Sequence, residues 1–261
     1  MKPLITKYDE AVARHRSVLC LGLDPDPASH PSTDEKLRFC LRMVDIVSKH
    51  VSAVKVNENF VRDFSITEHR KLTEAIHSHG LITIYDCKMN DIENTVRAGI
   101  TQVSKMGYDF ITFNPVMGTL AAAVKHGETH QVGVIVLLHP SNPESEKYFR
   151  TQLANGKKFY EKILEETVAA NADGAVVGLH PKITGEEVIQ IRSKLGEDKI
   201  ILFPGVGAQG GDLETAVLNG GRRILVNVGR TIIYSPEPEQ TASEINSRIN
   251  ELRHVHTGKN I

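Results

Sequence analysis

Charged side chains stand at the ends of three short apolar segments of this 261-residue chain. Asp86 and Lys88 close one segment, two residues apart, so on a regular strand both side chains would point to the same side. Lys55 lies near the end of a second segment, and Asp24 directly follows a third. Asp91 comes three residues after Lys88, at the start of a helical pattern. If these ends converge in the fold, lysines and aspartates alternate around one site.

An alternating array of lysines and aspartates suits the removal of CO2 from a substrate. Loss of CO2 leaves an electron pair on carbon, which must be stabilised where no metal, thiamine or pyridoxal group accepts it. A fixed ammonium group such as that of Lys88 can stabilise this charge and then donate the proton that replaces CO2. Neighbouring carboxylates would keep the lysines charged and in position. The pattern therefore predicts a decarboxylase that uses no cofactor.

A second group of residues suits a phosphate. The segment 203–211 carries four glycines between an apolar run and a helical pattern. Glycine lets backbone amides approach an anion closely, and the amino end of a helix adds a favourable dipole. Gly229 allows another close approach, and Arg230 adds a guanidinium that can contact a phosphate through two parallel hydrogen bonds. We therefore expect these two segments to bind the phosphate of the substrate.

Short apolar, β-branched runs recur along the whole chain, with helical patterns between them. The runs are near-continuous rather than alternating, which is typical of strands buried on both faces of a parallel sheet. Eight strands are predicted, at 18–23, 53–56, 81–85, 110–113, 132–138, 174–177, 200–203 and 224–226. Helices are predicted at 33–49, 67–79, 91–105, 118–126, 156–170, 184–195, 212–218 and 238–252. Thr33, Thr67 and Thr184, each followed by acidic residues, are predicted to mark helix starts.

Eight strand-then-helix units predict an α/β fold, a single (β/α)8 TIM barrel that spans residues 1–261. An open, doubly wound sheet uses the same alternation and is the alternative. In a barrel the carboxyl ends of the strands meet at one rim, and the loops after strands seven and eight commonly bind phosphate. The charged segment ends and the glycine-rich loop would then face one pocket. The longest irregular stretch, 139–155, is expected to act as a lid.

Composition argues against several classes of protein. The 31 Lys and Arg residues balance 32 Asp and Glu residues, so no net charge favours nucleic acid or a membrane surface. The first residues lack the apolar core of a secretory signal. A membrane-spanning helix needs about 18 apolar residues in succession, and the sequence has no such run. Three cysteines without a C-x-x-C pair argue against a disulfide framework, and we expect a cytoplasmic protein. His126 and His130 lack the spacing of a zinc protease, so no metal site is predicted.

The segment from Asp86 to Thr95 reads D-x-K-x-x-D-I-x-x-T and resembles the active-site segment of orotidine 5′-phosphate decarboxylases. Further matches follow in the family order: GLDPDP at 22–27, VK at 54–55, SNP at 141–143, PGVGAQGG at 204–211 and VGR at 228–230. The resemblance spans nearly the whole chain. It implies conversion of orotidine 5′-monophosphate to uridine 5′-monophosphate in pyrimidine synthesis, without a metal or an organic cofactor.

The resemblance also implies roles for the charged residues. Lys88 would donate the proton, Asp86 would lie beside the reacting carboxylate, and Lys55 would link Asp86 to the ribose. The family works as a homodimer with shared active sites, so Asp91 and Thr95 would reach into the site of the neighbouring subunit.

Contacts to the rest of the nucleotide are implied in the same way. Asp24 would contact the ribose, Ser141 the pyrimidine, and Gln209 and Arg230 the phosphate. The segment 138–143 can be aligned in two ways, which place either Ser141 or Leu138 against the base, and we choose Ser141. The run 57–59 matches no part of the family pattern, so no contact is predicted for it.

Three other functions fit parts of the pattern. A metal-dependent sugar-phosphate decarboxylase or aldolase of the same barrel group shares D-x-K-x-x-D, but Ile92, Thr95 and the segment 204–211 speak against it. A Schiff-base aldolase would use Lys55 as its nucleophile. A catalytically silent barrel would bind a nucleotide or a protein without turnover. The intact charged array argues against the silent barrel, and borohydride trapping with substrate would decide on the aldolase.

Overall fold

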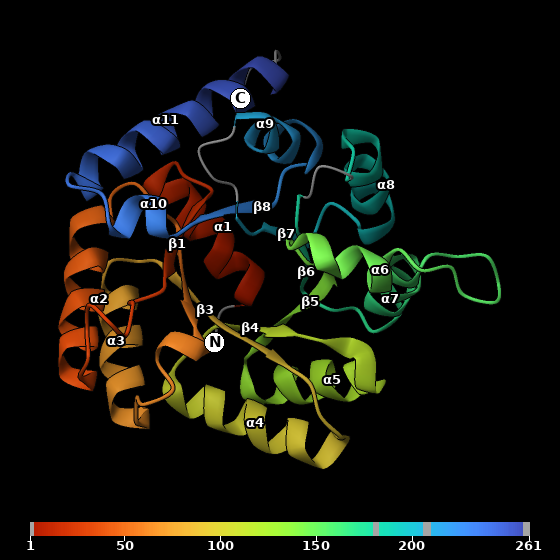
Figure 1. Ribbon diagram of the computed structural model, residues 1–261, viewed down its shortest axis with the longest axis horizontal. Helices are drawn as coiled ribbons and strands as arrows, with labels where there is room; N and C mark the ends of the chain where they lie inside the picture. The colour runs from red at the N-terminus through yellow and green to blue at the C-terminus, as the bar shows by residue number, and fades with distance from the viewer. Residues whose placement is uncertain (1–2, 180–182, 206–209, 258–261) are drawn as a thin grey trace.

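The apolar runs of the sequence form eight parallel strands that close into a barrel (Figure 1). The computed structural model describes residues 3–179, 183–205 and 210–257. Each strand pairs with the next along the chain, and the eighth pairs with the first, which confirms the predicted (β/α)8 fold. The strands are β1 Leu19–Leu23, β2 Ala53–Asn57, β3 Ile82–Met89, β4 Phe110–Phe113, β5 Gly133–His139, β6 Gly174–Val177, β7 Ile200–Phe203 and β8 Ile224–Val228.

Helices surround the barrel and pack on the outward side chains of the strands (Figure 1). The α-helices are α1 Leu4–His15, α2 Thr33–Val47, α3 Ile66–Ser78, α4 Glu93–Met106, α5 Leu120–His130, α6 Glu146–Phe149, α7 Phe159–Ala169, α8 Gly185–Leu195, α9 Gly210–Asn219, α10 Arg230–Ile233 and α11 Pro238–Thr257. The 3-10 turns are η1 Glu58–Phe60, η2 Pro115–Met117 and η3 Pro143–Ser145. The stretch 139–155 is therefore partly helical, through η3 and α6, rather than irregular throughout.

Helix α1 is not predicted by the sequence patterns, and it closes the amino-terminal end of the barrel (Figure 1). Tyr8 and Ala11 pack with the inward side chains of the strands. The Tyr8 hydroxyl donates a hydrogen bond of 2.8 Å to the carbonyl of Ile224, the first residue of β8. Lys7 forms an ion pair of 2.8 Å with buried Asp109, just before β4. With this end sealed, the carboxyl ends of the strands form the accessible mouth.

Helices α2, α3 and α8 start at hydroxyl caps, though not always at the predicted residue. The cap of α2 is Ser32, whose side chain accepts from the amide of Glu35, so the prediction of Thr33 is off by one. The cap of α3 is Ser65 rather than Thr67. Thr184 caps α8 as predicted, accepting from the amide of Glu187. In each case the hydroxyl satisfies an amide that the first helical turn leaves free.

The carboxyl end of β3 departs from regular strand geometry. Pairing with β4 shifts register between Tyr85 and Met89, and Lys88 has a left-handed backbone with φ of 46°. The predicted outcome holds, since Asp86 and Lys88 line the same cavity, but regular alternation does not produce it, because an irregularity intervenes. Helix α4 begins at Glu93, two residues later than predicted, so Asp91 lies in the connection between β3 and α4.

Candidate active site

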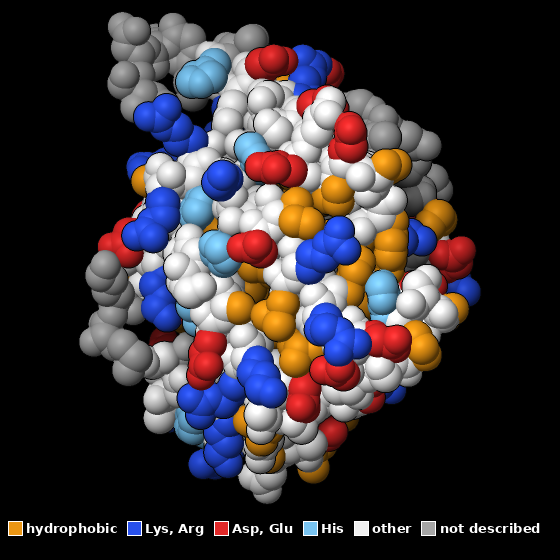
Figure 2. Space-filling model, turned by 90° about the vertical axis from the view of Figure 1, so that its left-hand side faces the viewer, with side chains coloured by type: hydrophobic (Ala, Val, Ile, Leu, Met, Phe, Trp, Pro, Cys, Tyr) orange, Lys and Arg blue, Asp and Glu red, His pale blue; other side chains and the backbone are white. Residues whose placement is uncertain are grey.

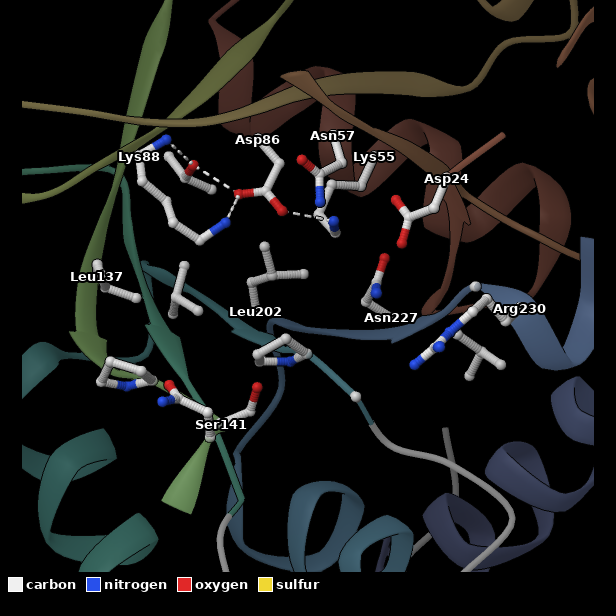
Figure 3. Close-up of a pocket in the computed structure, with 18 of the residues that line it drawn as sticks. Asp24, Lys55, Asn57, Asp86, Lys88, Leu137, Ser141, Leu202, Asn227 and Arg230 are labelled. Atoms are coloured by element: carbon white, nitrogen blue, oxygen red, sulfur yellow. Dashed lines mark hydrogen bonds and ion pairs between the residues drawn. The ribbon is translucent and has the colours of Figure 1, made fainter. Parts of the chain in front are cut away.

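Three charged side chains from β2 and β3 form a connected row at the carboxyl-terminal mouth of the barrel. The Nζ of Lys55 donates to Oδ2 of Asp86 at 2.6 Å. The Nζ of Lys88 donates to Oδ1 of the same carboxylate at 2.8 Å. Figure 3 shows Asp86 between the two ammonium groups. Both oxygens of the carboxylate are thus held by lysines from two neighbouring strands.

The electrostatic environment keeps Lys55 and Asp86 ionised. Burial alone would raise the pKa of Asp86, but the ammonium groups of Lys55 and Lys88 outweigh it and hold that pKa well below the ordinary carboxyl value. Burial alone would lower the pKa of Lys55, and the carboxylates of Asp86 and Asp24 raise it above its ordinary value instead. Lys55 is therefore an ammonium ion at neutral pH, and Asp86 is a carboxylate.

The two lysines differ in how accessible they are to a ligand. The side chain of Lys55 is only 6% exposed, whereas that of Lys88 is 46% exposed. Lys55 is accordingly a buried counter-ion for Asp86. Lys88 carries its charge into open space at the mouth, where a substrate can meet it.

The charged row lines a cavity of about 540 Å³, a size typical of small-molecule sites. Every strand, or the residue directly after it, contributes a lining side chain: Asp24, Lys55, Asp86, Thr112, Leu137, Val176, Leu202 and Asn227, in the order β1 to β8. In Figure 3, Lys88 and Asp86 lie at one end, Arg230 lies at the other, and Asp24 and Asn227 lie between them. The cavity is therefore elongated, with the row of charged side chains at one end and the guanidinium of Arg230 at the other.

The end near β8 is suited to an anion. Gly229 and Arg230 both line the cavity there. A side chain at Gly22 of β1 would come within 3.1 Å of the Cα of Gly229, so the two glycines let β1 and the end of β8 approach closely. Arg230 is the first residue of α10 and presents its guanidinium to the cavity (Figure 3). Gln209, predicted to help bind the phosphate, lies outside the described residues.

The cavity brings together most, but not all, of the predicted site residues. Asp24, Lys55, Asp86, Lys88, Ser141, Gly229 and Arg230 all line it. Leu138, the alternative to Ser141, is fully buried in the outer apolar layer. Asp91 and Thr95 are exposed and do not line the cavity of their own chain.

Further polar residues line the cavity, namely Asn57, Thr112, Asn142, Asn227 and Thr231, and two of them, Thr112 and Asn227, stand within apolar strands. Thr112 on β4 donates a hydrogen bond of 2.9 Å to Oδ1 of Asp86. Asn227 on β8 has a buried Oδ1 without a hydrogen-bond partner, beside the equally unpartnered Oδ1 of Asp24. The available signal is a polar residue inside an otherwise apolar strand run, since such a residue needs a partner.

His126 and His130, which the spacing excludes as a zinc signature, lie on α5, one turn apart. Their Nε2 atoms lie 3.2 and 3.4 Å from the hydroxyl of Thr101. Across residues 3–179, 183–205 and 210–257, no group of three or more His, Cys, Asp or Glu side chains could hold a metal ion.

Comparison with known proteins gives one consistent family. Residues 17–245 match the family described as orotidine 5′-phosphate decarboxylase / HUMPS. The chain is 31% identical over 258 residues to orotidine 5′-phosphate decarboxylase of Roseiflexus castenholzii, with 94% of each chain covered. It is 32% identical over 275 residues to the Haloarcula marismortui protein of that name, covering 94% of this chain and 97% of that one. The crystal structure of orotidine 5′-phosphate decarboxylase from Pyrococcus horikoshii OT3 has a TM-score of 0.69 at 25% identity, covering 89% and 99%.

Proposed function

This chain belongs to the orotidine 5′-phosphate decarboxylase / HUMPS family, and we propose that it converts orotidine 5′-monophosphate to uridine 5′-monophosphate in pyrimidine synthesis. The observation that carries this function is the Lys55, Asp86 and Lys88 row at the mouth of the barrel. It places an accessible ammonium group beside a fixed carboxylate, at the opposite end of the cavity from Arg230. A nucleotide that carries a carboxylate on its base and a phosphate on its ribose matches both ends.

The reaction follows from the charges at the Lys88 end. Breaking the bond to the carboxylate carbon releases CO2 and leaves the electron pair on the pyrimidine ring. The ammonium of Lys88, held by Asp86 at 2.8 Å, stabilises this charge and then donates a proton to the same carbon. Lys88 regains its proton from water, so one substrate and one proton give one product and one CO2. This chemistry calls on no metal or organic cofactor.

The remaining lining residues would hold the nucleotide in register with Lys88. We assign Asp24 and Lys55 to the ribose, because they lie between the two ends of the cavity. We assign Ser141 to the pyrimidine, and Gly229 and Arg230 to the phosphate. Such positioning by remote groups converts binding energy into correct alignment of the reacting bond.

The charge state of Lys55 argues against a Schiff-base aldolase. A lysine nucleophile must lose its proton, and enzymes achieve this by lowering the lysine pKa. The pKa of Lys55 is instead raised by Asp86 and Asp24. A metal-dependent member of the same barrel group is the other alternative, and the curated relatives that match over 94% of the chain are orotidine 5′-phosphate decarboxylases.

Turnover of orotidine 5′-monophosphate in the presence of a chelator tests this function. The purified protein is mixed with substrate, with and without EDTA, and the change in pyrimidine absorbance is followed while released CO2 is trapped. We expect equal rates in both conditions and one CO2 for each uridine 5′-monophosphate formed. Activity that disappears with EDTA and returns with a divalent metal would point to the metal-dependent alternative, and tight nucleotide binding without turnover to a silent barrel.

We further propose a two-fold homodimer whose subunits share their active sites. The residues from Asn90 to Thr95 are all exposed, directly after the catalytic end of β3. Ile92 within this segment is 58% exposed. Val116 and Met117 in the turn η2, which form a second exposed segment, are 55% and 51% exposed. The hydroxyl of Thr119 bonds to the carbonyl of Asp91 and joins the two exposed segments. An exposed apolar surface around charged residues suits a self-complementary interface, through which Asp91 and Thr95 would enter the partner's cavity.

Mixing two inactive variants tests the shared site. Lys88→Ala and Asp91→Asn proteins are unfolded together and reassembled, and each variant reassembled alone serves as the control. If Asp91 acts across the interface, a mixed dimer has one doubly damaged site and one intact site. Random pairing makes about half the dimers mixed, so about a quarter of all sites should regain activity. If Asp91 acts within its own chain, every site keeps one lesion and mixing restores nothing.

For other partners and location, the surface supports a small-molecule enzyme rather than a nucleic-acid or membrane protein. Acidic and basic side chains are interspersed over the face that carries α2 and α3 (Figure 2). Within the described ranges, no helix has the length and apolar character needed to span a bilayer. We place the enzyme in the cytoplasm, where thiols such as the free Cys20, Cys40 and Cys87 stay reduced.

A further inference from the structure

The pairing of β3 with β4 is interrupted at the catalytic end of β3. Tyr85 pairs with Ile111, and the next pair is Met89 with Phe113, so β3 spends four steps where β4 spends two. Within this gap Lys88 has φ of 46°, a conformation that residues with a Cβ rarely adopt. A backbone of this kind persists only where its surroundings hold it, and such sites cluster where function requires them.

The side chain of Thr112 fills the gap in the ladder. Its hydroxyl oxygen accepts a hydrogen bond of 2.9 Å from the backbone amide of Lys88. The same hydroxyl donates a hydrogen bond of 2.9 Å to Oδ1 of Asp86. The direction of both bonds is fixed, because an amide can only donate and an ionised carboxylate can only accept. Thr112 is 1% exposed, so water has little access to replace it.

The hydroxyl of Thr112 therefore links Lys88 to Asp86. It holds the backbone of Lys88 in its unusual conformation and fixes the carboxylate that the Lys88 ammonium also contacts. Oδ1 of Asp86 has two donors, the ammonium and the hydroxyl, while Oδ2 is held by Lys55. Without the hydroxyl, the Lys88 amide would lose its hydrogen-bond partner, and the backbone that carries the lysine would be free to leave its unusual conformation.

We propose that Thr112 is a positioning residue for decarboxylation, and that it acts by setting the place of Lys88 relative to Asp86. The inference rests on the proposed function of the same pocket. Its effect belongs to the chemical step rather than to nucleotide binding, because the groups assigned to ribose and phosphate are not bonded to Thr112. A displaced ammonium stabilises the transition state less well, although the product is still bound.

Thr112→Val is the primary test, because valine keeps the shape of threonine and removes the hydroxyl. We expect kcat for orotidine 5′-monophosphate to fall about 10- to 100-fold, the range for losing a hydrogen bond to a charged group. We expect KM and the dissociation constant of uridine 5′-monophosphate to stay within about twofold of the wild-type values, because the groups assigned to the ribose and phosphate are unchanged. Thr112→Ser keeps the hydroxyl and should restore most of kcat. Thr112→Ala carries the same expectation as valine, so the test does not depend on one variant folding.

A matched control separates this role from the general loss of a buried hydroxyl. Thr167 on α7 is fully buried, and its hydroxyl donates a hydrogen bond to the helix carbonyl of Ile163. Thr167→Val should lose stability without losing kcat. The wild-type protein is assayed in parallel. An inactive wild type would refute the proposed function, whereas an active wild type with unimpaired Thr112→Val would refute only the role of Thr112.

Three outcomes with an active wild type would overturn the inference. The first is a kcat for Thr112→Val within twofold of wild type. The second is a Thr112→Ser variant as impaired as Thr112→Val, which would show that the hydroxyl is not the important group. The third is an equal loss of product binding, which would show general damage to the pocket rather than displacement of Lys88.

Discussion

Replacing Lys55 with methionine would leave Asp86 buried with one ammonium partner instead of two. Lys55 and Asp86 are 6% and 9% exposed, and their charged atoms are 2.6 Å apart. At an effective dielectric constant of about 20 their attraction is about 6 kcal/mol, which is an upper bound because burying the ammonium also costs energy. Removing one partner of a buried pair costs about 3–5 kcal/mol, and Lys88 remains, so we expect a loss of about 3 kcal/mol.

Urea unfolding at pH 7, followed by circular dichroism, measures this loss. Methionine keeps the length and apolar stem of lysine, so the change is mainly one of charge. The double variant Lys55→Met/Asp86→Asn removes the stranded carboxylate and should recover much of the lost stability. Lys7→Met is the matched control: Lys7 also pairs with a buried aspartate at 2.8 Å, but its side chain is 38% exposed. A partly exposed pair should contribute only about 1 kcal/mol.

The pH dependence of the same variants gives an independent check. The pKa of Asp86 in the folded wild type lies below its ordinary value of 3.8, so its stabilising effect is full above that value. This effect is lost as the pH falls through the folded pKa. Without Lys55 the folded-state pKa of Asp86 rises toward its ordinary value, so the variant should lose less stability than the wild type as the pH falls below 3.8. If the unfolding free energies of wild type and Lys55→Met at pH 7 lie within about 1 kcal/mol, and both lose the same stability in acid, Lys55 does not stabilise the Asp86 carboxylate.

Two predictions concern the binding of the nucleotide. Arg230→Ala should weaken binding of uridine 5′-monophosphate about 10- to 100-fold and barely affect uridine, as measured by calorimetry, because its guanidinium is assigned to phosphate alone. Equal losses for both ligands would contradict that assignment. Asn227→Leu should raise KM about tenfold by removing the unpartnered buried acceptor that faces the ribose position. An unchanged KM would show that a nucleotide does not use this amide.

The fold could be predicted because its signal is local and repeated. Each strand is an apolar run buried on both faces, and each run is followed by a helical pattern, so small errors at the ends do not change the topology. Helix α1 escaped prediction because Pro3 precedes it without a side-chain cap, and no start signal is present. Its place is set by tertiary contacts such as the bond from Tyr8 to Ile224, which have no local pattern.

The site was predictable where a charged residue ends an apolar run, as at Lys55 and Asp86. The detailed geometry was not, because the irregularity at Lys88 depends on how β3 pairs with β4. The proposed role of Thr112 depends on that irregularity. Threonine is common in strands, so its presence in the sequence gives no signal of such a role. In the dimer proposed above, the partner of Asp91 would lie across an interface that one chain does not contain.

Turnover by Lys88→Ala, compared with product binding by the same variant, shows whether Lys88 carries the chemical step. Lys88 is assigned both charge stabilisation and proton donation, which together are worth at least about 10⁴-fold in rate. Lys194→Ala, an exposed lysine change on α8, serves as the control. We predict that kcat for orotidine 5′-monophosphate falls by at least that factor while calorimetry shows nearly unchanged binding of uridine 5′-monophosphate. A Lys88→Ala protein that retains turnover within tenfold of wild type would contradict it.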